Sequence, residues 1–208
     1  MKRNITKIAG AILALIVLLP LINLKAADIE RPEEIKSKRL IVYDTDTYKK
    51  LAERAIDQLS EDDLHKVIGD ENNSVAIIAG HISGNLKSRS TDFLSSDGEK
   101  EWRHRDNEFE DRKLSKSEIL KQIETGWKTL LDTLDSLTND DLNRTITIRQ
   151  KPLKVIEALT RSLAHTSYHV GQIITISKII LGKNWETLSI PKGKSEEYNL
   201  NPTLEKFK

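Results

Sequence analysis

The chain has 208 residues, 38% hydrophobic and 31% charged, which predicts one globular domain with extensions and excludes a disordered chain. It has no cysteine, which excludes disulfides, zinc–thiolate sites and a cysteine nucleophile. The net charge is +1, but the first 26 residues carry four bases and no acid, and the remaining 29 bases and 32 acids give a slightly acidic body, which argues against nucleic-acid binding.

Residues 1–26 have the layout of a secretory signal: a basic start, an apolar run over 8–24 and small residues after it. If cleavage followed Ala26, Leu24 would lie three residues before the cut, where signal peptides favour a small residue. The apolar run is at the low edge of the lengths that span a bilayer, ~17–25 residues. A cleaved signal peptide and an uncleaved membrane anchor both stay open. Either places the body outside the cytoplasm, in the periplasm or a similar compartment, or tethers it to a membrane; a cytoplasmic location is the less favoured alternative.

Two helices are predicted in the first half of the body. Residues 27–43 are charged, contain Pro32 and are interpreted as a linker, after which an amphipathic helix begins near Asp44. A polar loop separates it from a second helix over residues 74–94. Gly80 and Gly84 lie inside that second helix, where each costs about 1 kcal/mol relative to alanine. This cost suggests that another group approaches the backbone closely there.

A long, charged connection over residues 95–114 follows the second helix, and it contains Trp102 and Phe109. Aromatic residues in a charged loop usually pack against another part of the protein or a partner. We therefore do not expect this connection to be purely solvated. A third helix begins with the capping-box pattern of Ser115 and Glu118. The stretch "RTITIRQ" is expected to be an extended connection or a small hairpin, and a fourth, very apolar helix is expected over residues 152–182.

Four amphipathic helices of this length predict an all-α fold, an up-down antiparallel four-helix bundle over residues 44–199. The long connection lies between its second and third helices. The hydrophobic leader precedes the bundle, and residues 200–208 form a C-terminal tail.

Two histidines, His165 and His169, lie four residues apart on the bundle side of the fourth helix. Two imidazoles at this spacing on one helical face can bind a single metal ion. The residues between them are Thr-Ser-Tyr, so the glutamate base of zinc metalloproteases is missing. Gln172 lies on the same stripe, one turn further on.

A third ligand could come from the second helix, where His81 lies between two isoleucines near the buried face. Asn85, Ser88 and Asp92 follow it on one polar stripe. A lone histidine on an apolar face is more often a hydrogen-bonded core residue, but burying three imidazoles without a partner is costly. The two other histidines, His65 and His104, lie in polar segments and are interpreted as surface residues.

The stretches "DLHKV", "GHISGNLKSRSTDFLSSDGEKEWRHRDNEFE", "AHTSYHVGQI" and "WETLSIPKGKSEEYN" resemble an uncharacterised branch of the DinB-like (YfiT-like) superfamily of metal-dependent proteins. The resemblance covers roughly residues 44–199. It implies a four-helix bundle with zinc or nickel held by His81, His165 and His169, in a superfamily whose characterised members include thiol-dependent transferases and isomerases. The leader departs from this pattern, because members are mostly soluble cytoplasmic proteins.

Three histidine ligands leave a coordination position open, which is typical of a catalytic metal site. Asn85, Asp92 and Gln172 are candidates for orienting the ligands or a substrate. Arg89 and Arg105 are candidates for binding an anionic group. The hypothesis is a hydrolase or a small-thiol-dependent transferase; the alternative is a non-enzymatic, exported or tethered bundle that binds a partner and has structural histidines.

The partners expected with the enzyme hypothesis are a small-molecule substrate, for which a low-molecular-weight thiol is one candidate, and no nucleic acid. Membrane contact is expected only through the N-terminal segment. A homodimer is left open.

Overall fold

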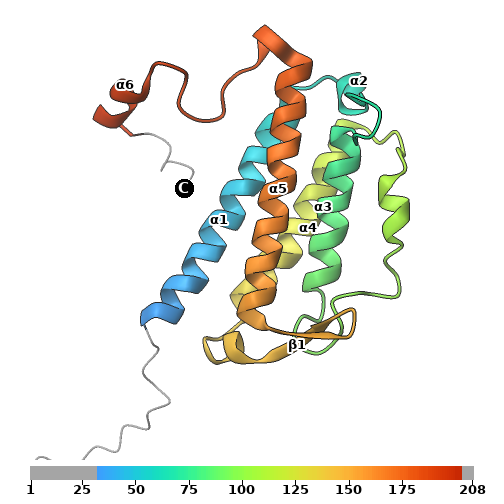
Figure 1. Cartoon of the computed structure of the whole chain (residues 1–208), viewed down its shortest axis with the longest axis vertical. Helices are drawn as coiled ribbons and strands as arrows, with labels where there is room; N and C mark the ends of the chain where they lie inside the picture. The colour runs from blue at the N-terminus through green and yellow to red at the C-terminus, as the bar shows by residue number, and fades with distance from the viewer. Residues whose placement is uncertain (1–31, 203–208) are drawn as a thin grey trace, which may run out of the picture. The chain divides into compact units, whose positions relative to one another are not determined.

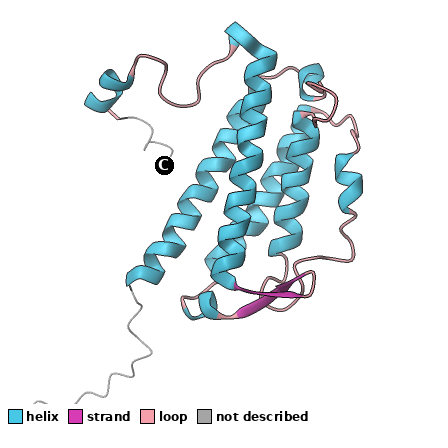
Figure 2. Ribbon diagram, in the orientation of Figure 1, coloured by secondary structure: helices cyan, strands magenta, loops and turns pink. Residues whose placement is uncertain are grey.

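The computed structural model describes the backbone of residues 32–202 and the side chains of residues 45–202. This part is mostly helical, as predicted, with four long packed helices and one small hairpin (Figures 1 and 2). The long helices are α1 (Pro32–Asp57), α3 (Val75–Ser90), α4 (Lys116–Ser136) and α5 (Val155–Leu181). The shorter elements are α2 (Glu61–Leu64), η1 (Arg105–Phe109), η2 (Asp140–Asn143), β1 (Thr145–Ile148), β2 (Lys151–Lys154), η3 (Gly182–Asn184) and α6 (Ser195–Leu200).

Helices α3 and α4 run in the same direction, which differs from the predicted up-down order. Ser83 donates a hydrogen bond to the carbonyl of Gln122, and Thr133 donates one to the carbonyl of Ser90 at 3.0 Å, so contacts advance along both helices together. The reason is the long connection predicted between them, which carries the chain back along the length of α3 before α4 begins (Figure 1).

Helix α1 begins about twelve residues earlier than predicted, so most of the predicted linker is helical. Pro32 is its first residue, and proline is favoured there because the first turn of a helix has no use for its missing N–H group. Further along α1, the carbonyl of Thr45 accepts a hydrogen bond of 3.0 Å from the buried indole of Trp127 in α4.

The stretch "RTITIRQ" forms part of an antiparallel hairpin in which β1 pairs with β2. Pro152 lies in β2 opposite Thr147, so α5 begins three residues later than predicted, at Val155. Two other boundaries follow the prediction: Ser115 and Glu118 form the capping box of α4, and Gly182 caps α5 with a positive φ of 53°.

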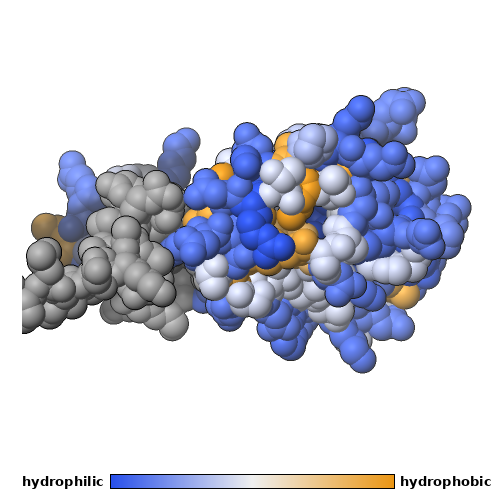
Figure 3. Space-filling view, turned by 90° about the horizontal axis from the view of Figure 1, so that it is seen from below, coloured by the Kyte–Doolittle hydropathy of each residue, from blue (hydrophilic) through white to orange (hydrophobic). Residues whose placement is uncertain are grey.

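Figure 3 looks onto the end that carries the hairpin, where hydrophilic side chains surround a strip of apolar ones.

The core lies between the four long helices and is made of aliphatic side chains around Trp127. Its fully buried members come from all four helices and include Ile56, Ile82, Ile123 and Ile173. Burial of each such side chain stabilises the fold by roughly 1.5–3 kcal/mol, which explains why four amphipathic helices pack together.

The predicted leader lies outside the described residues. Among residues 32–202 the structure contains no helix both long and apolar enough to cross a membrane.

Candidate metal centre

Three histidines from two helices meet at one point in the helix assembly. His81 projects from α3, and His165 and His169 project from adjacent turns of α5. The Nε2 atom of His165 lies 3.3 Å from that of His81 and 3.2 Å from that of His169. His81 is 5% exposed and the other two rings are half-buried. The three side chains can therefore offer one nitrogen each to a single ion.

Two of the three rings are held from behind through Nδ1. Nδ1 of His81 lies 2.8 Å from Oε2 of Glu108, and Nδ1 of His169 lies 2.7 Å from Oε1 of Gln172. Because an acceptor oxygen faces Nδ1 in each of these two rings, the neutral ring carries its proton on Nδ1. The Nε2 lone pairs are then left free and directed at the common centre.

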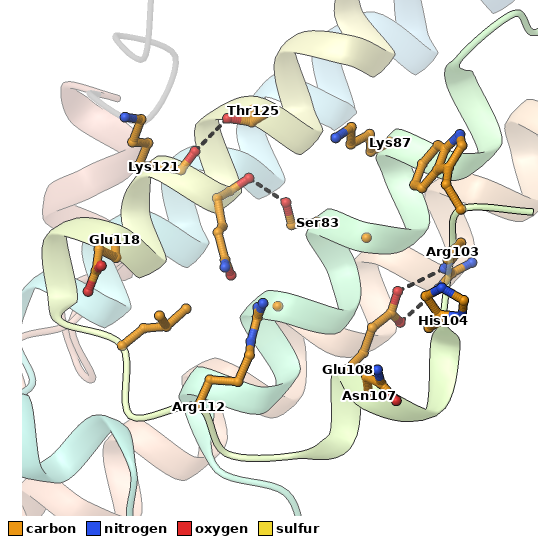
Figure 4. Close-up of a pocket in the computed structure, with 15 residues that line it drawn as sticks. Ser83, Lys87, Arg103, His104, Asn107, Glu108, Arg112, Glu118, Lys121 and Thr125 are labelled. Carbon is orange, nitrogen blue, oxygen red and sulfur yellow. Dashed lines mark hydrogen bonds and ion pairs between the residues drawn. The ribbon is translucent and has the colours of Figure 1, made fainter. Parts of the chain in front are cut away.

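Glu108 comes from η1, the short 3-10 helix within the charged connection, and lies against α3. Arg103 binds both of its oxygens, with Nε at 2.8 Å from Oε1 and Nη2 at 2.9 Å from Oε2 (Figure 4). Burial opposes the charge of Glu108, but the hydrogen bonds from His81 and Arg103 outweigh it and lower the pKa of this carboxyl. Glu108 is thus an anion behind His81.

Gly84 makes room for Glu108. A Cβ atom at position 84 would overlap the Glu108 carboxylate, whereas one at Gly80 would meet only ordinary contacts, with Oε1 of Gln122 at 3.6 Å. The close approach predicted for the helix that contains Gly80 and Gly84, α3, is therefore confirmed at Gly84, and the approaching group is the Glu108 carboxylate.

Burial favours the neutral form of His165 and His169. Burial lowers the pKa of His165 to about 4, and the charges that His169 and His81 would carry act in the same direction. Burial also lowers the pKa of His169, against the hydrogen bond to Gln172. Neutral imidazole is the form that binds a metal ion.

The three nitrogens fit a divalent metal ion. A tetrahedral zinc with nitrogen ligands at ~2.0–2.1 Å would separate those ligands by ~3.3 Å. The two separations that involve His165, 3.3 and 3.2 Å, agree with this value, and the nitrogens of His81 and His169 lie within 4.8 Å of each other. A carboxylate behind one ligand and an amide behind another are the outer partners that metal-binding histidines commonly have.

A pocket of about 160 Å³ opens beside the histidines, and both His81 and His165 line it. We call it the arginine pocket, because five arginine side chains also line it: Arg89, Arg103, Arg105, Arg149 and Arg161. A larger groove of about 650 Å³ lies on the α4 side of Glu108, and none of the three histidines lines it (Figure 4).

Of the four polar residues predicted to support the site, Gln172 and Asn85 lie near the histidines, whereas Ser88 and Asp92 do not. Gln172 lies against His169, and Asn85 lines the arginine pocket. Ser88 is fully buried and donates a hydrogen bond to the carbonyl of Gly98 at 2.8 Å. It therefore anchors the start of the charged connection to α3. Asp92 is exposed beyond the end of α3, with φ of 48°, and the structure does not bring it to the histidines. The predicted polar stripe breaks there because α3 ends at Ser90.

Of the two histidines interpreted as surface residues, His104 is exposed. His65 is not: its Nδ1 lies 2.7 Å from Asp111 and its Nε2 lies 3.0 Å from the carbonyl of Leu114. Its side chain is only 14% exposed and anchors the end of the charged connection.

Glu108 and Arg103, the two residues that the connection contributes to the site, were not predicted from the sequence. Three signals were present. Phe109 lies beside Glu108 in the chain, and its ring packs 5.0 Å from that of His81. Trp102 lies next to Arg103 in the chain, with the ammonium of Lys87 5.2 Å from its ring. Gly84 marked the place where the carboxylate approaches.

Comparison with known proteins gives a family without an assigned function. No curated protein matches the chain. The family described as "Protein of unknown function (DUF1572)" matches residues 38–194, which include all three histidines, Arg103, Glu108 and Gln172. Because this match covers most of the chain, the protein belongs to the DUF1572 family.

Proposed function

We propose that the protein is a DinB-like metal-dependent enzyme in which His81, His165 and His169 bind one divalent ion, zinc or nickel. In this proposal the four packed helices are a DinB-like four-helix bundle, in which the second long helix, α3, supplies His81 and the fourth, α5, supplies His165 and His169. The observation that carries the proposal is the convergence of three Nε2 atoms, two of them on rings whose Nδ1 is held by Glu108 or Gln172.

A purely structural role for these histidines explains the geometry less well. With all three rings neutral and the protons of His81 and His169 on Nδ1, only the ring of His165 can donate within the cluster, and a single proton cannot satisfy both neighbours. Nδ1 of His165 is also buried without a hydrogen-bond partner. Lone pairs directed at one another repel, and a cation at their centre would convert that repulsion into attraction.

Three protein ligands leave a position open to a substrate. A metal ion bound by the three histidines would polarise an electrophile at this open position, or lower the pKa of a water or thiol bound there. The chain itself orients the rings: Glu108 and Gln172 accept the Nδ1 protons of His81 and His169, and Arg103 keeps Glu108 ionised. Because the chain has no cysteine, any thiol must arrive with a small molecule. The reaction class proposed is hydrolysis or thiol transfer.

Elemental analysis of the purified protein tests the metal. After loading with zinc or nickel and dialysis, the unaltered protein should retain about one ion per chain. His165→Ala should retain little, because it removes the nitrogen that lies between the other two. His104→Ala is the matched control, since His104 is exposed and outside the cluster, and it should retain the ion. Stoichiometric metal in His165→Ala would refute the three-histidine site.

An activity screen then separates the enzyme from the non-enzymatic alternative. The metal-loaded protein is offered electrophiles with several low-molecular-weight thiols, and separately hydrolysable esters and amides. Turnover that His165→Ala loses supports the enzyme. A loaded protein that is inert toward both panels supports a tethered or exported binding module instead.

We also propose that residues 8–24 export the protein or anchor it to a membrane. The mass of the mature chain distinguishes the two outcomes, because cleavage near Ala26 removes the leader and anchoring keeps it.

A further inference from the structure

The arginine pocket has more positive than negative charge. Glu108 is bound by Arg103, and Glu99 is shared between Arg89 at 3.2 Å and Arg149 at 2.7 Å. Two carboxylates therefore serve three arginines. The remaining two are Arg105, which has only the exposed Asp106 at 3.6 Å, and Arg161, which has no ion pair among the described residues.

Residues that line the pocket also carry buried polar atoms without partners. In the described part of the chain, four buried side-chain atoms lack a hydrogen bond, and three of them belong to residues that line this pocket. They are Nη1 of Arg103, Oγ of Ser162 and Nδ1 of His165. The side chain of Arg103 is only 2% exposed, so its unpaired N–H group is held away from solvent. An unsatisfied buried donor on a charged group is costly, and a ligand with acceptor oxygens would satisfy it.

The rest of the lining restricts the ligand further. Phe93, Leu130, Ile148 and Leu159 form an apolar wall. The volume of about 160 Å³ is below the ~300–1,000 Å³ of pockets for drug-sized ligands. A small acid with a short apolar part suits both the charge and the size.

We propose that the arginine pocket binds the anionic group, a carboxylate or a phosphate, of a small organic acid. Arg161 and Arg103 bind its oxygens, and the apolar wall packs against a few carbons. His81 and His165 line the same pocket, so the acid is anchored directly beside the three-histidine centre. Its role as substrate of that centre rests on the proposed function, whereas its binding to the pocket does not.

Calorimetric titration of the purified full-length protein tests this inference with three probes of similar size: butyrate, butyl phosphate and the uncharged butyramide. Each is titrated into metal-loaded protein and into protein stripped of metal and freed of chelator. We expect saturable binding of at least one anion in both forms, one per chain, and none of butyramide. Whichever anion binds more tightly identifies the acid as a carboxylate or a phosphate.

Arg161→Ala should weaken anion binding about ten-fold or more, because it removes charge-assisted hydrogen bonds at the pocket. Arg112→Ala is the matched control: this exposed arginine lines the neighbouring groove and not the arginine pocket. Metal content should be unchanged in both variants. Anions that bind no better than butyramide, or equal affinity in Arg161→Ala, would overturn the inference; anion binding without retained metal would instead overturn the proposed function alone.

Discussion

Glu108 connects the charged loop to the metal centre. Its carboxylate accepts from His81 on one side and binds Arg103 on the other, while η1 holds it against the surface of α3. A carboxylate behind a histidine ligand fixes the ring and raises its basicity. The residue therefore acts through His81, as a positioning residue.

Gly84→Ala should move Glu108 without altering any histidine. The new Cβ atom would overlap the flexible end of Glu108, which must withdraw from His81. We expect metal affinity to fall about 10–100-fold, as for the loss of other such outer partners. Competition with a chromogenic chelator measures this change.

Gly80→Ala is the matched control, one helical turn away, because its Cβ atom meets nothing closer than 3.6 Å. Its metal affinity should equal that of the unaltered protein. Equal affinities in all three proteins would show that Glu108 does not position His81.

Helices α3 and α4 approach each other closely at Gly126. A Cβ atom there would lie 2.8 Å from Cα of Ser83 and 3.0 Å from its carbonyl oxygen, and backbone atoms cannot withdraw as a side-chain end can. Gly126→Ala should therefore lower the free energy of unfolding by about 1–3 kcal/mol, the usual cost of overpacking. Urea unfolding followed by circular dichroism measures it.

Gly171→Ala on α5 is the comparison, because nothing lies within 4 Å of its added Cβ atom. With helix propensity alone acting, it should raise the free energy of unfolding by up to about 1 kcal/mol. The same sign for both substitutions would contradict the close packing of α3 on α4.

The hairpin depends on Asp97, which lies in the connection. The turn residues Arg149 and Gln150 both have positive φ, 52° and 62°, a conformation that usually selects Asn or Gly. Asp97 accepts hydrogen bonds from their amides at 2.8 and 2.7 Å and from the amide of Glu99 at 2.7 Å. Burial opposes its charge, but the amides of Glu99, Gln150 and Arg149, with the Thr147 side chain, outweigh it and hold its pKa well below the usual range.

Asp97→Asn should cost about 1–3 kcal/mol of unfolding free energy at pH 7, because one amide donor would then face an NH₂ group. Since the pKa is lower in the folded state, the stabilisation is complete above the unfolded value of ~3.9 and is lost as the pH falls below it. The difference between the two proteins in urea unfolding should thus shrink below about pH 4.

Asp106→Asn, at a side chain that is 99% exposed, should show little difference at any pH. A cost for Asp97→Asn that does not change between pH 7 and pH 3 would rule out the charge of Asp97 as its cause.

At the scale of the whole molecule, local periodicity predicted the helices well and the arrangement of the chain less well. The spacing of His165 and His169 and the apolar neighbours of His81 placed all three imidazoles on inward faces, and the structure brings them together. Periodicity could not show that α3 and α4 are parallel, because that depends on the path of the connection. Glu108 and Arg103 were missed for the same reason: a loop has no period that assigns a side chain to a face.

The proposed function requires one metal ion among His81, His165 and His169. Anomalous diffraction at the zinc or nickel absorption edge, from crystals of the metal-loaded protein, tests it most directly. We expect one strong peak ~2.0–2.1 Å from all three Nε2 atoms. A loaded crystal with no peak at that point, or with its peak on other residues, would contradict it.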